Sequence, residues 1–223
     1  MMVRGATSTG VTLAETVAAA LRETILSGGF VSGERLVENK IAQAHDVSQN
    51  TVRDALRILE QEGWVVKNPR RGVYVRTLNT ADATELCALI ASVETLALTW
   101  ALEQPDKALR AELRGLLTAA SKAASAGQSQ ESFKRLIGFH MRIGIASKPL
   151  TAEVLETLYN QIRLLEALRQ ARAPRAAHEL QRLIDSHEAI MEAIDVGDAD
   201  AACQSLREQI AAYHMAIVAA LRV

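Results

Sequence analysis

Hydrophobic residues recur every three to four positions in three segments near the N-terminus, and this spacing predicts three amphipathic helices. The first segment covers residues 11–27 and ends at a Gly-Gly pair, which is a common stop signal for a helix. The second covers residues 38–44. The third covers residues 49–62 and begins after Ser48, whose hydroxyl can accept a hydrogen bond from a free N–H of the first turn.

Two short runs rich in β-branched and aromatic residues follow these helices, at residues 64–67 and 73–76, and they predict strands. The turn-forming sequence Asn-Pro-Arg-Arg-Gly at residues 68–72 joins the two runs. Residues 35–37 form a further short extended segment between the first two helices. The order of helix, strand, two helices and hairpin is that of a winged helix-turn-helix.

After Leu78 the pattern changes to long helical stretches with no strand signal. These stretches lie near residues 81–103, 106–126, 129–146, 150–170, 177–196 and 199–221. The predicted fold is therefore mostly α, with a winged helix-turn-helix and its small β wing followed by an all-helical bundle of about six helices. The predicted divisions are a flexible tail at 1–10, a winged domain at 11–78 and a helical domain at 79–223.

Charge adds a local signal to this picture. The formal net charge is only −1, but residues 63–78 hold four basic side chains and no acidic one. A basic stripe on a nearly neutral protein suits a contact with DNA that a single segment makes. Cys87 and Cys203 are isolated, which favours the reducing cytosol. No signal peptide is recognisable and no run approaches eighteen apolar residues, so we expect a cytoplasmic protein without a membrane span.

The N-terminal segments resemble a known family. The carrying segments are Ser-Gly-Glu-Arg-Leu at 32–36, Val-Ser-Gln-Asn-Thr-Val-Arg-Asp-Ala-Leu at 47–56, Leu-Glu-x-Glu-Gly-Trp-Val-Val at 59–66 and Arg-Arg-Gly-Val-Tyr-Val at 70–75. Residues 34–76 resemble the DNA-binding domain of GntR-type transcription regulators. The resemblance implies a bacterial regulator that binds double-stranded DNA.

The resemblance and the docking geometry of helix-turn-helix proteins assign roles to individual residues. Gln49, Asn50 and Arg53 face base edges of the major groove, where arginine bonds guanine and amides bond adenine. Ser48, Thr51 and the free N–H groups beside them hold phosphate. The full set of expected DNA contacts is Arg35, Ser48, Gln49, Asn50, Thr51, Arg53, Arg71 and Gly72.

Three of these contacts lie outside the recognition helix. Arg35 resembles a family arginine that contacts phosphate or base, Arg71 can reach the minor groove, and Gly72 permits a close backbone approach. One departure matters, because many members carry Arg-Thr-Pro where this chain has Gln-Asn-Thr at 49–51. We expect that difference to change the operator sequence and to leave the docking mode unchanged.

Residues 81–221 resemble the all-helical FCD effector domain of the FadR branch of these regulators. The resemblance rests on Phe-His at 139–140, Lys-Pro-Leu at 148–150, His-Glu-Ala-Ile at 187–190, Gly-Asp-Ala-Asp-Ala-Ala at 197–202 and Leu-Arg-Glu-Gln at 206–209. It implies a small-molecule pocket inside the bundle. In many such domains an Asp, a His four residues later and two further His bind a divalent metal that helps to hold a carboxylate.

Helical spacing turns His140 and His187 toward the core, but the other family positions differ. Leu136 replaces the carboxylate, Gln209 replaces the third histidine, and Ile90 replaces an arginine that often binds the effector's acid group. Hard divalent metals favour carboxylate ligands, and a stable site needs at least three protein groups. We expect an effector pocket at these five residues that has lost tight metal binding and takes an uncharged ligand. No cofactor is expected, although His140 and His187 offer a weak site for a divalent metal.

Several alternatives stay open at this stage. Glu131, Asp185 or His214 could complete a metal site and restore a carboxylate effector, or the two core histidines could be purely structural. The chain could be an architectural DNA-binding protein without an effector, or its winged helix could contact protein instead of DNA. Arg53 could also pair with Asp54 or Asp46 on the surface.

Enzymatic activity is a separate class of function. The chain has no Gly-rich phosphate loop, no nucleophile elbow and no catalytic triad, and neighbours such as Ser186 and His187 point about 100° apart on a helix. We therefore expect no enzymatic activity. The expected function is that of a repressor that binds a pseudo-palindromic operator as a homodimer under control of a small-molecule effector.

Overall fold

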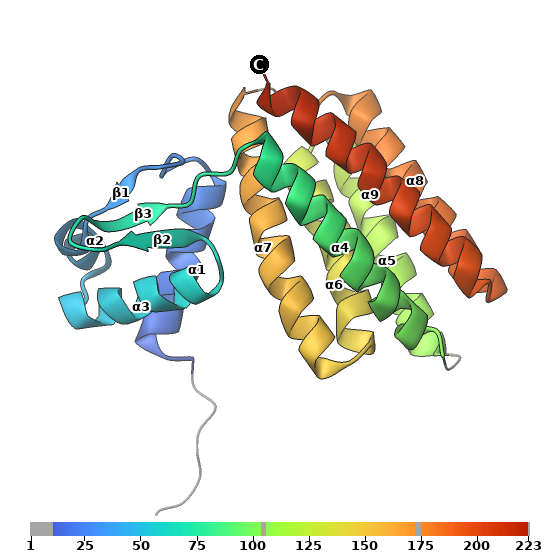
Figure 1. The fold of residues 1–223 in the computed structure, drawn as a ribbon, viewed down its shortest axis with the longest axis horizontal. Helices are drawn as coiled ribbons and strands as arrows, with labels where there is room; N and C mark the ends of the chain where they lie inside the picture. The colour runs from blue at the N-terminus through green and yellow to red at the C-terminus, as the bar shows by residue number, and fades with distance from the viewer. Residues whose placement is uncertain (1–10, 104–105, 173–174, 223) are drawn as a thin grey trace, which may run out of the picture. The chain divides into compact units, whose positions relative to one another are not determined.

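The chain folds into two compact units, which divide between Thr77 and Leu78. The computed structural model describes residues 11–103, 106–172 and 175–222 (Figure 1). The tail predicted at residues 1–10 lies outside the described part.

The N-terminal unit is a winged helix-turn-helix, as the sequence predicts. Its elements are α1 (Leu13–Leu26), β1 (Arg35–Leu36), α2 (Glu38–His45), α3 (Gln49–Gln61), β2 (Val65–Asn68) and β3 (Gly72–Val75). The three strands form an antiparallel sheet in the order β1-β3-β2. Tyr74 on the central strand pairs with Arg35 on one side and with Val66 on the other.

Local chemistry explains where these helices begin and turn. Thr12 and Glu15 form a reciprocal capping box at the start of α1. Asp46 takes a left-handed conformation with φ of 51°, and this allows the sharp turn between α2 and α3. The buried faces of α1 and α3 pack together, with Leu21 and Leu56 among the residues of the small core.

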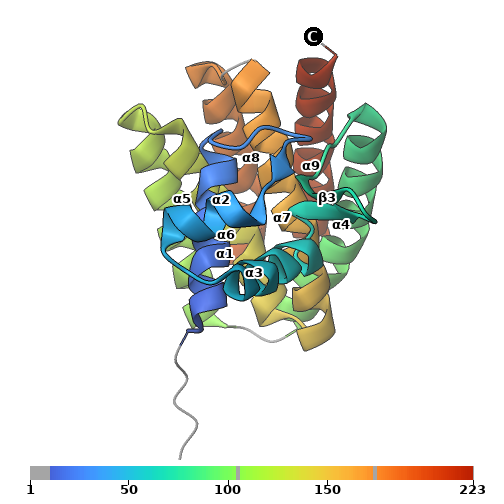
Figure 2. The ribbon, with the colours of Figure 1, turned by 90° about the vertical axis from the view of Figure 1, so that its left-hand side faces the viewer.

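The C-terminal unit is a bundle of helices, and the mostly α fold class is confirmed. Its elements are α4 (Thr80–Ala101), α5 (Lys107–Ser125), α6 (Ser129–Ala146), α7 (Pro149–Arg172), α8 (Ala177–Val196) and α9 (Ala199–Leu221). All six follow the predicted stretches closely. Helix α4 lies beside α9 (Figure 2). Helix α5 packs against α6.

Helix α4 forms one side of the bundle core. Among the described helices it alone is long and apolar enough to span a membrane by length and composition, with a mean hydropathy of 1.3. Here it packs against α6, α7 and α9 and buries Leu86, Ile90 and Leu98. It also buries the carboxylate of Glu94, which is fully inaccessible to solvent. These contacts are those of a core helix in a helical bundle.

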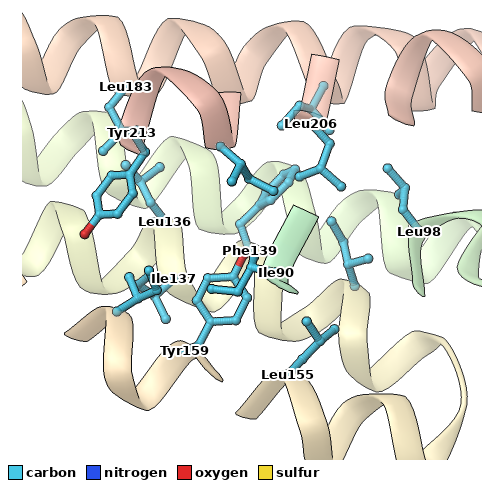
Figure 3. Packing of buried hydrophobic residues seen from close by; sticks show 14 of the residues in the cluster. Ile90, Leu98, Leu136, Ile137, Phe139, Leu155, Tyr159, Leu183, Leu206 and Tyr213 are labelled. Atoms are coloured by element: carbon cyan, nitrogen blue, oxygen red, sulfur yellow. The ribbon is translucent and has the colours of Figure 1, made fainter. Parts of the chain in front are cut away.

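The core of this unit surrounds the region where the sequence predicts a pocket. Figure 3 shows Ile90 from α4, Leu136 from α6, Tyr159 from α7 and Tyr213 from α9 among the buried side chains that meet there. Because each of these residues comes from a different helix, a ligand in the core would touch most of the bundle.

Candidate DNA-binding and effector sites

The N-terminus of α3 presents the residues that the sequence assigns to DNA. Ser48 caps the helix, since its hydroxyl accepts a hydrogen bond from the backbone N–H of Thr51 at 3.1 Å. The two hydroxyls lie 2.9 Å apart. Gln49, Asn50 and Arg53 are exposed on the same end of the helix. The structure thus brings these five residues together, and their contacts with DNA stay a prediction.

Arg53 is held by an ion pair that the sequence analysis did not anticipate. Its Nε donates to Glu38 Oε2 at 2.7 Å, and its Nη1 donates to Asn50 Oδ1 at 3.4 Å. The suggested pairing with Asp54 is wrong, because adjacent residues on a helix diverge and Asp54 instead accepts from Arg57. The suggested Asp46 is not the partner either, since Glu38 at the start of α2 takes that place.

The wing brings Arg35 and Gly72 into direct contact. The backbone of Gly72 has φ of +108°, and a Cβ atom at this position would lie 3.0 Å from Nε of Arg35. The glycine therefore makes room for the Arg35 side chain beside β3. Arg71 lies at the exposed turn of the hairpin, where its carbonyl accepts a hydrogen bond from the hydroxyl of Tyr74 at 3.1 Å.

All five residues of the expected effector pocket line one cavity in the helical unit. The cavity has a volume of about 30 Å³ and includes Ile90, Leu136, His140, His187 and Gln209 in its wall. The remaining wall residues, which the sequence analysis did not single out, are Cys87, Phe133, Ile137, Tyr159, Ile162, Leu183, Ile210 and Tyr213. The structure thus brings the predicted residues together, while their role in effector binding stays a prediction.

His140 and His187 form a buried pair at this cavity. Their Nε2 atoms lie 2.9 Å apart. His187 Nδ1 lies 2.6 Å from the carbonyl oxygen of Leu183, so Nδ1 carries the proton and donates it. Burial, together with the nearby His140, lowers the pKa of His187 to about 3. His187 is therefore neutral, and its Nε2 accepts a hydrogen bond from Nε2–H of His140.

Glu94 is the functional candidate that sequence reasoning missed. One of its carboxylate oxygens lies 2.6 Å from Nδ1 of His140, and the other accepts a hydrogen bond from the hydroxyl of Tyr159. Burial and the neighbouring Glu94 raise the pKa of Tyr159 well above its usual value, so the hydroxyl stays protonated. The sequence did offer a signal for Glu94, because it is an acid one turn after Ile90 on the inward face of an apolar helix.

Glu94, Tyr159, His140 and His187 form one buried hydrogen-bonded network. A carboxylate that is wholly removed from water requires a paired counter-charge or a proton. The partner of the Glu94 carboxylate is His140, whose Nδ1 lies 2.6 Å from Oε1 of Glu94. The atoms of Glu94, His140 and His187 that face one another are therefore already hydrogen-bonded.

The residues present do not fit the divalent metal that the FCD resemblance implies. The two imidazoles point at each other, but Leu136 offers no ligand and Gln209 offers only a neutral amide oxygen. No group of three or more His, Cys, Asp or Glu side chains within residues 11–103, 106–172 and 175–222 is arranged to hold a metal ion. Glu94 is engaged as the hydrogen-bond partner of His140, so we assign no metal-dependent step to this site.

The three residues suggested as substitute ligands lie elsewhere. Glu131 pairs with Arg135, Asp185 accepts from Gln181, and His214 bonds the hydroxyl of Thr84 at 3.0 Å. These three contacts place the side chains away from the cavity wall. The suggestion that they complete a metal site is therefore wrong for this arrangement.

Comparison with known proteins identifies both units. Residues 13–75 match the family described as bacterial regulatory proteins, gntR family, and residues 85–212 match the FCD domain. The second match covers more than half of the chain.

Three relatives of this chain are named as transcriptional regulators or repressors. The gluconate operon transcriptional repressor of Bacillus licheniformis is 26% identical over 202 residues, or 86% of this chain and 79% of that protein. The probable D-xylose utilization operon transcriptional repressor of Paenarthrobacter nicotinovorans is 26% identical and covers 89% of this chain and 87% of its own length. The transcriptional regulator YdhC of Bacillus subtilis is 28% identical over 116 residues, which span only 52% of either chain.

Two solved structures resemble this chain over nearly its whole length. A GntR-type transcriptional regulator from Rhodococcus sp. RHA1 has a TM-score of 0.77 and 27% identity, and covers 92% of this chain and 97% of its own. The E. coli protein McbR/YncC has a TM-score of 0.81 and 22% identity, with coverage of 94% and 98%. At that identity the second likeness shows the fold alone.

Proposed function

Since this chain belongs to the GntR family of transcription regulators and carries an FCD domain, we propose that it represses transcription as a homodimer on a pseudo-palindromic operator. The observation that supports the proposal most is the capped start of α3, where Gln49, Asn50 and Arg53 are exposed together. Such a helix end can enter the major groove and present amides and a guanidinium to base edges.

The homodimer is expected because a winged helix-turn-helix contacts only a short stretch of DNA. One winged helix covers a short half-site, and two heads related by a twofold axis read a palindrome. We place the subunit contact on the helical unit, because α4 leaves Leu89 and Leu96 exposed in addition to its buried face. Apolar side chains on the outer face of a core helix are typical of subunit interfaces.

The helical unit supplies the regulatory input. FCD domains bind small-molecule effectors, and the cavity between α4, α6, α7, α8 and α9 is the place we propose for one. A ligand there changes operator affinity only if it binds the DNA-competent and DNA-incompetent forms with different affinities. The relatives that are named as repressors of sugar or sugar-acid operons support control by a small metabolite.

We propose that the protein acts on DNA in the cytoplasm and catalyses no reaction. Its relatives are transcription regulators, and Cys87 and Cys203 are buried free thiols, as suits a reducing compartment.

The test is a titration of fluorescent double-stranded DNA taken from the region upstream of the chain's own gene. We expect saturable binding at physiological salt, and light scattering of the complex should give two chains per duplex. The proposal fails if the DNA is bound no more tightly than a scrambled duplex of the same length, or if one chain saturates the site.

A further inference from the structure

Two polar atoms in the cavity wall are buried without a partner. Oε1 of Gln209 and the hydroxyl of Tyr213 have no hydrogen-bond partner among the described residues, and both side chains are more than nine-tenths buried. A buried polar group that lacks a partner costs roughly 1–3 kcal/mol, so native proteins normally satisfy it. Both residues line the same cavity, which is therefore the place where a partner can bind.

The described residues of the cavity wall include no Asp, Glu, Lys or Arg side chain, and their polar groups supply hydrogen bonds. Two of them, His140 and His187, already hydrogen-bond each other, and His140 also pairs with Glu94. Burial raises the pKa of the Cys87 thiol to about 11, so this wall residue is neutral. Burial, with Glu166 nearby, raises the pKa of Tyr213 well above its usual value, so its hydroxyl keeps a proton to donate.

Two buried arginines near Tyr213 share a single carboxylate, that of Glu166. Arg169 and Arg175 both donate to Glu166, with nitrogen–oxygen distances of 2.6 and 2.8 Å. Arg175 also lies over the ring of Phe133, 5.8 Å from its centroid. Neither arginine belongs to the cavity wall. An anionic ligand in the cavity would therefore touch no Lys or Arg side chain among the described wall residues, and burial of its charge there is costly.

We propose that this cavity binds an uncharged ligand bearing an amide or hydroxyl group, which donates to Gln209 Oε1 and accepts from the hydroxyl of Tyr213. The proposal rests on the function proposed above and names the class of its effector. A carboxylate cannot make this pair of bonds, because it has no hydrogen to give Gln209.

The size of the cavity adds a consequence for regulation. Its volume of about 30 Å³ holds roughly one or two water molecules, whereas pockets for metabolite-sized ligands occupy roughly 300–1,000 Å³. A metabolite can therefore bind only if the surrounding helices move apart. That movement gives the differential affinity which ligand control of DNA binding requires.

The experiment compares acetamide with acetate, which have the same shape and differ in charge and in the N–H donors. The full-length protein is labelled with ¹³C at the isoleucine δ1 methyl groups, four of which (Ile90, Ile137, Ile162 and Ile210) line the cavity. We expect acetamide to shift these four resonances saturably and acetate to leave them unchanged. Ile41, in the core of the N-terminal unit, is the internal control and should not shift with either probe.

Two variants assign the effect to the proposed groups. Gln209→Met keeps the side-chain volume and removes the acceptor, and Tyr213→Phe removes only the hydroxyl. Each should weaken acetamide binding at least tenfold. Equal or tighter binding of acetate, no saturable shift with acetamide, or undiminished acetamide binding in both variants would overturn the proposal. DNA binding by the same samples is measured separately, so a failure of the ligand proposal can be distinguished from a failure of the proposed function.

Discussion

Arg53 is the side chain on which we propose that DNA recognition depends most directly. It is exposed, and in this structure Glu38 and Asn50 hold its guanidinium beside the start of α3. An exposed pair of this kind contributes about 0–1 kcal/mol, so DNA can compete for the guanidinium. We therefore propose that Glu38 orients Arg53 before DNA binds and leaves it free to form a bidentate bond to guanine.

Replacement of Arg53 by alanine tests that role. We expect Arg53→Ala to weaken specific operator binding by about 1–3 kcal/mol, since one bidentate base contact is lost. Fluorescence anisotropy on a selected operator gives the affinity. Arg57→Ala is the matched control, because Arg57 lies one turn further along α3 and pairs with Asp54. Equal affinities for all three proteins would show that Arg53 does not read a base.

The metal ligands that this chain lacks can be restored. Leu136 lies one turn before His140, and Gln209 shares the same cavity. The double variant Leu136→Asp, Gln209→His should bind Zn²⁺ or Mn²⁺ with about one ion per chain, because a carboxylate and a third imidazole complete the donor set. Isothermal titration measures the uptake, and the parent protein is the control. Equal uptake by the two proteins would mean that the alignment of these positions is wrong.

His187 makes stability depend on pH. In the folded protein its pKa is about 3, against 6.5 for an ordinary histidine. As the pH falls below 6.5, His187 becomes protonated in the unfolded chain but stays neutral in the folded chain. The stabilisation is thus complete above that pH and declines by roughly 1.4 kcal/mol per pH unit toward pH 3. Urea unfolding between pH 7 and about pH 4 gives the free energy of unfolding at each pH. That free energy should fall less steeply with falling pH in His187→Asn than in the parent protein. An identical pH dependence in the two proteins would contradict the low pKa of His187.

The residues of the candidate site were predictable to different degrees. Helical spacing alone turned His140 and His187 inward, and the cavity contains both. Glu94 was missed because its partners, His140 and Tyr159, lie 46 and 65 positions away in sequence, and no local pattern reports such contacts. The ion pair of Arg53 was missed for the same reason, because its partner Glu38 belongs to another helix.

At the scale of elements, chain periodicity and end signals predicted the helices well. All six long helices begin and end close to the predicted positions, because Asn79, Asp106 and Asp198 cap three of them and Gly197 ends another. The pairing of β1 with β3 was not derivable from such signals, since strand pairing depends on contacts distant in sequence.

The wing depends on the one glycine that faces Arg35. Gly72→Ala places a Cβ at 3.0 Å from Nε of Arg35 and forces a side chain into backbone with φ of +108°. We expect a loss of about 1–3 kcal/mol in stability or operator affinity. Gly115→Ala is the matched control, because Gly115 lies exposed in α5 with open space around it. That change should instead stabilise by about 0.5–1 kcal/mol, and calorimetry of both variants distinguishes the two outcomes.

At the scale of the whole molecule, we propose that the helical unit controls the DNA-binding unit through its small cavity. The cavity residues come from five helices, so a ligand that expands the cavity must shift several of them at once. A shift of that kind is discrete rather than gradual, because packed helices have few alternative arrangements. We propose that operator affinity then follows the balance between two populations of a homodimer.

Selection of DNA from a random double-stranded library by the full-length protein tests the proposed DNA recognition most directly. We predict enrichment of one pseudo-palindromic motif, with two half-sites about 10 base pairs apart or a multiple of that spacing. Selection with Arg53→Ala should relax the preference at one position in each half-site. A library that stays random after repeated rounds, or a motif without twofold symmetry, would contradict the central claim.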